Sequence, residues 1–313
     1  MNSVITKHLL QIIIWLLALG CIVLIYSKSK TPDKTYNVSR SPVWPERIIS
    51  LAPNITEILF ALGLDDQIVA VSSDSDTPDD ALEKQKVGTF WRPNTEVIIA
   101  SKPDLVVTLQ FEQQKAAAES LGRLGYHVLT LKIEKTEDLI SAIEKIGEAT
   151  HRKDSAKELI EDISNQLDDL KARFSSDDKV KVLWVIQNEP LRVVGRNTFI
   201  NEIIELAGGE NAIGPTIQKY PAIGTEVLMT SQAQVIIQSA MAKDDIDKQT
   251  QRAEKFWSKM TNLPAVKNNR IFVIDSDNVL RLGPGLPDGV RLIGHCLHQL
   301  SPKQKHESIQ QSR

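Results

Sequence analysis

Residues 47–63 decide the fold class, and they read RIISLAPNITEILFALG. Residues 47–51, which include the apolar Ile48, Ile49 and Leu51, predict a short buried strand. Asn54 follows as the expected N-cap of a helix, with Glu57 three residues later, and the apolar helix ends at Gly63. A strand, a turn and a short helix in this order are typical of an α/β fold.

The same alternation continues along the rest of the chain. Between about residue 136 and residue 174, apolar residues recur every three or four positions, so we expect one long amphipathic helix or two that abut. The expected strands before this helical stretch are residues 68–71, 105–109 and 128–131, and those after it are residues 180–186, 235–238 and 271–274.

A chain of 313 residues suits two lobes with separate cores and a terminal appendage. We therefore expect two α/β lobes separated by one long helix. The expected parts are a signal peptide or membrane anchor (1–26), a tether (27–45), an N-terminal α/β lobe (46–150), a linking helix (151–176), a C-terminal α/β lobe (177–302) and a polar tail (303–313).

An internal similarity supports the division into two lobes. The stretch TEVIIAS at residues 95–101, with LVV at 105–107, aligns without a gap on TEVLMTS at 225–231, with VII at 235–237. The pattern predicts the same helix-to-strand unit in each lobe, although short helix-strand patterns also recur by chance.

The N-terminal segment differs from everything that follows it. Residues 9–26 are apolar apart from Gln11, and as a helix they would span roughly 27 Å, close to the thickness of a bilayer core. Lys7 precedes the segment, and small residues stand just before Cys21. An uncleaved anchor, a cleaved signal peptide and a lipid-modified Cys21 all fit this pattern, and each places the body outside the cytoplasm.

The composition argues against nucleic acid as a partner and against an internal disulfide. Hydrophobic residues make up 42% of the chain and charged residues 25%, with a formal charge of -3, so no basic field is available for nucleic acid. Cys296 has no other cysteine in the body of the chain, so we expect no internal disulfide.

Several short motifs, taken together in their order and spacing, resemble one family of binding proteins. They are RIISLAPNITE (47–57), VGTF (87–90) with NTE (94–96), KPDLVV (102–107), TFI (198–200) with GGEN (208–211), YP (220–221) with Glu226, and Arg281 with GP (283–284). The chain resembles the periplasmic binding proteins that carry cobalamin, iron-siderophore complexes or haem to ABC importers, most closely the cobalamin-binding branch.

This resemblance implies a class III periplasmic binding protein, in which two doubly wound α/β lobes are joined by one long rigid helix. It also implies little hinge motion and a ligand held between the lobes. It implies permease subunits as partners and a location at the periplasmic face of the inner membrane, anchored or released. Two departures bear on the ligand. Asp74 stands in the segment 72–76, where cobalamin binders often carry an aromatic residue, and Gly285 replaces a second basic residue found in many relatives.

A site for a large, flat, partly apolar ligand needs aromatic faces and a few polar groups. Each candidate also has a structural explanation: surface packing for Trp91, helix capping for Asn54 and solvation for Arg281. We expect Trp184 and Trp257 to lie in the core. The candidate ligand-binding residues are Pro53, Asn54, Asp74, Phe90, Trp91, Tyr220 and Arg281.

Glu96 and Glu226 occupy equivalent positions in the repeated unit, one in each lobe. The resemblance implies that these carboxylates meet arginines of the two permease subunits. Stabilisation of the local helix start by a negative charge is the alternative explanation.

The sequence does not predict an enzyme. It contains no G-x-S-x-G motif and no P-loop, and residues 283–285 lack the spacing of a dinucleotide-binding motif. His295, Cys296 and His298 lie together without a third cluster of ligands, so we expect no metal site. Cobalamin would be a transported ligand and not a cofactor.

Three other functions remain open at this point. A haem or ferric-siderophore receptor of the same fold would use Tyr220 as the obvious cleft ligand. A membrane-anchored α/β enzyme would need a nucleophile or an acid-base pair that the sequence does not display. A signalling sensor would fit an uncleaved anchor.

Overall fold

The structure is a computed structural model of the full chain, and it describes residues 44–240, 245–275, 279 and 281–298. The predicted signal peptide or anchor, most of the predicted tether and the predicted polar tail lie outside these ranges. Within them, no helix has both the length and the apolar character that a membrane crossing requires.

The first sheet contains five parallel strands in the order β3-β2-β1-β6-β7. Every residue of β1 and β6 is buried, as expected for central strands that helices cover on both faces. The strands are β1 (Ile48–Ser50), β2 (Ile68–Val71), β3 (Gln85–Lys86), β6 (Leu105–Leu109) and β7 (Val128–Leu131), and the helices around them are α2 (Pro53–Ala61), the 3-10 helix η1 (Asp79–Ala81), α3 (Thr95–Ala100), α4 (Glu112–Arg123) and α5 (Thr136–Thr150).

The predicted start of the first helix is wrong by two residues. Helix α2 begins at Pro53, and its N-cap is Ala52, which has no capping side chain. Proline suits the first helical position because its φ is already helical and its missing N–H would have no partner there. Asn54 is therefore inside the helix, whereas the predicted end is confirmed by Gly63, which follows the C-cap with a φ of +68°.

The second sheet repeats the parallel arrangement with the order β10-β8-β11-β12, and the short strand β9 pairs antiparallel with β8. Trp184 in β8 and Trp257 in α9 are buried, which confirms their predicted place in the core. The elements are β8 (Val180–Gln187), β9 (Arg192–Val193), α7 (Phe199–Leu206), β10 (Gly209–Asn211), α8 (Thr225–Thr230), β11 (Val235–Ser239), α9 (Ile246–Trp257), α10 (Pro264–Lys267), β12 (Ile271–Ile274) and α12 (Leu286–His298).

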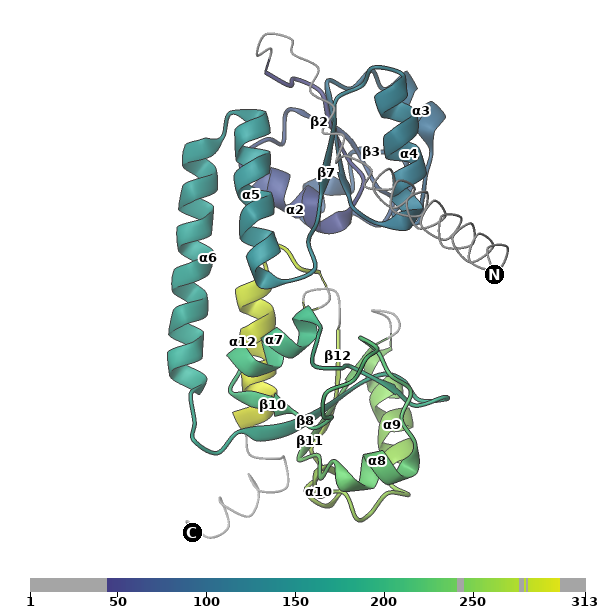
Figure 1. The fold of residues 1–313 in the computed structure, drawn as a ribbon, viewed down its shortest axis with the longest axis vertical. Helices are drawn as coiled ribbons and strands as arrows, with labels where there is room; N and C mark the ends of the chain where they lie inside the picture. The colour runs from purple at the N-terminus through teal and green to yellow at the C-terminus, as the bar shows by residue number, and fades with distance from the viewer. Residues whose placement is uncertain (1–43, 241–244, 276–278, 280, 299–313) are drawn as a thin grey trace, which may run out of the picture. The chain divides into compact units, whose positions relative to one another are not determined.

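The long helical stretch between the sheets is two helices. Helix α5 ends at Thr150, His151 adopts a left-handed φ of 59°, and α6 (Lys153–Phe174) continues for 22 residues. Helix α6 packs against α5 and also against α12 and α7 (Figure 1). Helix α6, which links the two lobes, therefore contacts elements that precede it and elements that follow it in the sequence. We use N-terminal lobe for residues 44–150 and C-terminal lobe for residues 177–298.

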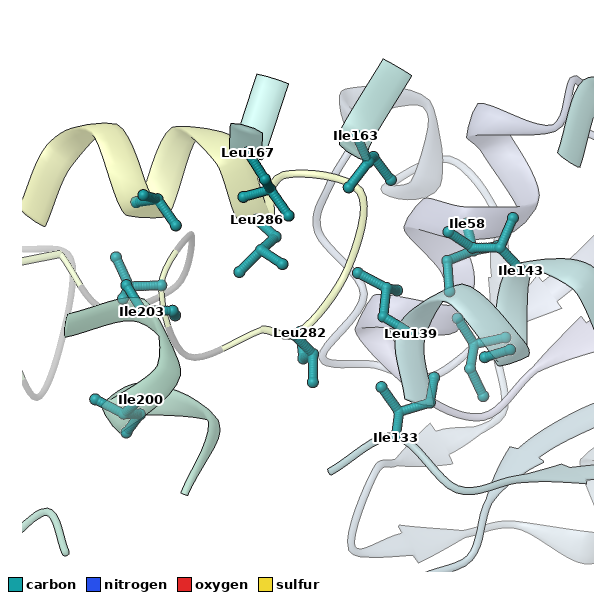
Figure 2. Close-up of a cluster of buried hydrophobic side chains, with 14 of the residues drawn as sticks. Ile58, Ile133, Leu139, Ile143, Ile163, Leu167, Ile200, Ile203, Leu282 and Leu286 are labelled. Atoms are coloured by element: carbon teal, nitrogen blue, oxygen red, sulfur yellow. The ribbon is translucent and has the colours of Figure 1, made fainter. Parts of the chain in front are cut away.

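The largest hydrophobic cluster includes residues from both lobes and from α6. Figure 2 shows Leu282 and Leu286 between the side chains of α5, such as Leu139, and those of α7, such as Ile203. Leu167 of α6 belongs to the same cluster. Because the interior is close-packed, a change in lobe orientation would break these contacts, so the core opposes hinge motion.

The contact between α6 and α12 gives a direct test of this core. A Cβ atom added at Gly294 of α12 would lie 2.2 Å from the buried ring of Phe174. We expect Gly294→Ala to lower the free energy of unfolding by about 1–3 kcal/mol, measured by chemical denaturation, because the ring must move within a packed interior.

Gly122→Ala in α4 is the matched control, since a Cβ atom there has no neighbour within 4 Å. It should leave stability unchanged or raise it by about 0.5–1 kcal/mol through helix propensity. Equal effects of the two substitutions would contradict the close packing of α6 on α12.

Candidate functional site

Phe90 and Trp91 form the turn of a short hairpin beside the first sheet. Strand β4 (Gly88–Thr89) pairs antiparallel with β5 (Arg92–Pro93), and the two aromatic residues join them. Gly88 has a φ of +94°, and a Cβ atom on it would lie 2.5 Å from the Arg92 carbonyl oxygen, so only glycine fits this hairpin. The predicted loop position of both aromatic residues is confirmed.

A third aromatic residue, Phe111, completes what we call the aromatic triad (Phe90, Trp91 and Phe111). The Phe90 ring centroid lies 4.9 Å from that of Trp91 and 5.4 Å from that of Phe111, with edge-to-face geometry. Trp91 is 57% exposed and Phe111 is 40% exposed. The triad therefore presents an apolar surface to solvent beside the carboxyl end of β6.

Sequence reasoning missed Phe111, although a signal was present. Phe111 is the N-cap residue of α4, a position that normally carries a small polar side chain. A bulky exposed aromatic residue has no local reason to stand there, so its position immediately after a strand indicates a surface role.

The Asn54 side chain forms a hydrogen bond that joins the two lobes. Its side chain is buried, its Nδ2 donates to the Leu282 carbonyl oxygen at 3.1 Å, and its Oδ1 accepts from the Ile55 N–H. Pro53 precedes it as the first residue of α2. Both polar atoms of the Asn54 side chain are thus engaged inside the protein.

Arg281 forms ion pairs with carboxylates of the N-terminal lobe. One guanidinium nitrogen lies 2.5 Å from Asp76 Oδ1 and 3.5 Å from Glu57 Oε1. Its other terminal nitrogen donates weakly to the Asp74 carbonyl oxygen at 3.5 Å. The Arg281 side chain is 18% exposed, so the sequence alternative of a solvated surface arginine does not describe it. Sequence reasoning did not identify its carboxylate partners, which are more than 200 residues away.

Tyr220 lies in the C-terminal lobe and is 37% exposed. Burial, with a smaller contribution from Glu134, raises the pKa of its phenol above the ordinary value, so the phenol is neutral at physiological pH. The neighbouring Lys219 Nζ lies 3.2 Å from Glu134 of the N-terminal lobe. Ile217, three residues before Tyr220, is fully exposed.

Contacts between the lobes bring the carboxyl edges of the two sheets face to face. Glu134, after β7, pairs with Lys219, after β10, and Asp76, after β2, pairs with Arg281, after β12. In parallel α/β sheets, ligands bind at the carboxyl ends of the strands. Five of the seven predicted ligand residues follow strands at these edges, and the other two, Phe90 and Trp91, reach the first edge through the hairpin.

One open groove lies elsewhere, between α5 and α6. It has a volume of about 650 Å³ and is lined mainly by charged side chains such as Glu144, Lys153 and Lys157. None of the predicted ligand residues lines it. It is therefore a solvated surface groove and not the predicted site.

The two glutamates of the repeated unit occupy matching positions. Glu96 and Glu226 are the second residues of α3 and α8, which are both six residues long and both precede a buried strand. Both side chains are exposed. The match extends to the backbone, since Lys102 and Gln232 at corresponding positions have positive φ values of 46° and 49°.

The C-terminal histidines and cysteine have structural roles. His298 stacks on the Phe174 ring at 5.3 Å, and its Nε2 is hydrogen-bonded to the Ala207 carbonyl oxygen. Burial raises the pKa of the Cys296 thiol to about 11, so the thiol is neutral and a poor nucleophile. The described ranges contain no group of three His, Cys, Asp or Glu side chains placed to hold a metal ion.

Comparisons with known proteins agree with this geometry. Residues 48–278 match the family model described as "Periplasmic binding protein". The vitamin B12-binding protein of Vibrio parahaemolyticus is 31% identical over 261 residues, which cover 83% of this chain and 91% of that protein. These matches confirm the expected class, a binding protein and not an enzyme.

Two solved structures share the fold. The periplasmic vitamin B12 binding protein BtuF of Vibrio cholerae superposes with a TM-score of 0.70 and 26% identity, covering 81% of this chain and 96% of that one. The periplasmic haem binding protein HutB of Vibrio cholerae gives a TM-score of 0.71 and 25% identity, with coverage of 81% and 99%. Both support the expected class III architecture, and the chain belongs to the periplasmic binding protein family.

Proposed function

We propose that this protein captures cobalamin or a related corrinoid between the facing carboxyl edges of its two sheets and delivers it to an ABC importer. The observation that carries the proposal is the exposed aromatic triad at the edge of the first sheet. Aromatic faces suit a large, flat and partly apolar ligand, and the similar Vibrio parahaemolyticus protein is named for binding vitamin B12.

The other predicted ligand residues take different parts in this proposal. Tyr220 would supply a neutral phenol from the C-terminal lobe, as a hydrogen-bond donor or acceptor. Arg281 would set the distance between the lobes through its ion pairs, at the edge where the ligand is proposed to bind. Pro53 and Asn54 would contribute the backbone at the start of α2.

Haem or a ferric siderophore is the second candidate ligand. Similarity to HutB, a haem binding protein, and the partly exposed Tyr220 favour it. Ligation of ferric iron by Tyr220 would require a phenolate, which the bound iron would itself stabilise. The exposed aromatic triad and the similarity to a vitamin B12-binding protein favour the corrinoid, as cargo and not as a resident cofactor.

We infer an extracytoplasmic location, at the periplasmic face of the inner membrane, from the family and from the apolar residues 9–26. An uncleaved anchor, a cleaved signal and a lipid on Cys21 remain the three forms of this proposal, and each leaves the binding lobes outside the cytoplasm. The mass of the mature protein would distinguish them.

Calorimetric titration of the purified protein tests the ligand. We expect one cobalamin to bind per chain, because the two facing edges form a single site. Clear binding of haem or a ferric siderophore, with no heat from cobalamin, would replace the corrinoid by the second candidate.

Truncation of the aromatic triad tests the surface that carries the proposal. Phe90→Ala combined with Trp91→Ala should weaken cobalamin binding by roughly 1–3 kcal/mol, the usual scale for aromatic anchors, as measured by the same titration. Leu124→Ala is the matched control, since Leu124 is an exposed apolar residue at the other end of α4. Unchanged affinity in the folded double variant would assign both aromatic residues to surface packing.

We further propose that Glu96 and Glu226 dock the protein onto two permease subunits. Their matched, exposed positions on equivalent helices support this role. Two charges on lobes held by a common core would fix orientation through charge-assisted hydrogen bonds without touching the ligand. Helix capping is an incomplete alternative for Glu96, because Asn94 already caps α3 through its side chain.

Glu96→Ala combined with Glu226→Ala should therefore abolish uptake in a reconstituted transporter while ligand affinity and fold are kept. Glu119→Ala with Glu254→Ala, which removes one exposed glutamate from another helix of each lobe, is the control and should transport normally. Normal transport by the Glu96 and Glu226 double variant would contradict the docking proposal. Stabilisation of the two helices would then explain the matching positions of these residues.

A further inference from the structure

The backbone of Phe90 is held on both sides by side chains from other segments. Asp74 Oδ2 accepts a hydrogen bond from the Phe90 N–H at 2.5 Å. Gln114 Nε2 donates to the Phe90 carbonyl oxygen at 3.1 Å. The residue that contacts both other members of the aromatic triad is thus fixed by two polar side chains.

The Gln114 side chain is itself held in place by hydrogen bonds. It is fully buried in the first turn of α4, and its Nε2 also donates to the Leu51 carbonyl oxygen at 2.8 Å. Its Oε1 accepts from the Leu109 N–H at 2.9 Å and from the Thr108 hydroxyl. These four hydrogen bonds use the full capacity of the amide group.

The position of Gln114 beside the first sheet explains its reach. Leu51 follows β1 and Leu109 ends β6, and these neighbouring strands are the point where the strand order of the first sheet reverses. At such a reversal the connections that follow the two strands run in opposite directions, and ligands of α/β proteins bind beside these strand ends. Gln114 bridges the ends of β1 and β6 and ties the aromatic hairpin to both strands.

Asp74 is also anchored, although its side chain is exposed. The preceding residue, Ser73, donates its N–H to the Gly88 carbonyl oxygen at 2.7 Å. The following residue, Ser75, is buried, and its hydroxyl is hydrogen-bonded to those of Thr56 and Ser72 at 2.8 Å. The carboxylate therefore projects from a segment that is fixed on both sides.

The hairpin turn needs such support. Two-residue turns that match the twist of a hairpin place at least one central residue at positive φ. The residues with positive φ in the described ranges do not include Phe90 or Trp91. Because the turn lacks this favoured geometry, its conformation depends on hydrogen bonds from residues outside the hairpin.

We propose that Asp74 and Gln114 are positioning residues that hold Phe90, and through it the aromatic triad, in the arrangement that receives the ligand. The proposal rests on the proposed function only in taking the triad as the ligand surface. It assigns to Asp74 a role other than the direct ligand contact expected from the sequence. Fixing the triad before binding removes the entropy cost of ordering three aromatic side chains in the complex.

The first test uses ligand-free protein and four single variants. Asp74→Ala removes the acceptor, Asp74→Asn keeps an acceptor oxygen without the charge, and Gln114→Glu keeps the acceptors but loses both donors. Asp104→Ala is the matched control, since Asp104 Oδ2 also accepts backbone N–H groups, from Glu46 and Arg47 at 3.0 Å, but precedes β6 at the opposite edge of the sheet.

The readout is Trp91 itself, through acrylamide quenching of its fluorescence and the near-ultraviolet circular dichroism of the triad. Each signal is taken as the difference from the same variant carrying Trp91→Phe. Asp74→Ala and Gln114→Glu should increase quenching and diminish the dichroism, whereas Asp74→Asn and Asp104→Ala should match the unsubstituted protein. Unchanged signals in Asp74→Ala would overturn the proposal even if Gln114→Glu fails to fold.

The second test measures cobalamin affinity. Asp74→Ala should weaken binding about tenfold, because the cost of ordering one or two mobile side chains in the complex is of this size. Asp74→Asn should bind cobalamin as tightly as the unsubstituted protein. Equal loss in both variants, with normal Trp91 signals, would identify Asp74 as a charged ligand contact and overturn positioning. If the unsubstituted protein binds no cobalamin, the proposed function fails, while the ligand-free signals still decide the role of Asp74.

Discussion

The packing of α6 against both lobes is the constraint on which the rest of the structure depends. Ile163 contributes to the same hydrophobic cluster as Ile58 and Ile143 of the N-terminal lobe, and Leu167 and Phe174 extend it to the C-terminal lobe. Since a close-packed interior does not deform continuously, the cluster holds the lobes in one arrangement. The facing edges of the sheets can then form a site without large closure.

Polar contacts between the lobes complete this arrangement at the edges. Glu202 of α7 accepts two hydrogen bonds from Thr136 at the start of α5, at 2.9 and 2.8 Å, where the helix dipole favours a negative charge. Arg281 pairs with Asp76 on the other lobe. Such mostly buried charges are costly to separate, so they favour one spacing between the lobes over alternatives.

In the candidate site, apolar and polar side chains have different roles. The exposed surface is aromatic, while Asn54, Asp74 and Gln114 direct their polar atoms to the backbone of neighbouring segments. Under the proposed function such a surface would bind by contact area and shape, and its polar groups would act by limiting motion. This arrangement suits a large, flat ligand.

The sequence by itself determined the α/β class, the strands of four or more residues, the buried tryptophans and the turn position of Phe90 and Trp91, because hydrophobic periodicity and turn residues are local signals. Only the tertiary structure decided the partners of Asn54, Asp74 and Arg281, and it added Phe111 and Gln114 to the site. A polar side chain in a loop has the same sequence signature whether it faces a ligand or another segment. Its partner lies far along the chain, as Leu282 does from Asn54, and only folding brings the two together.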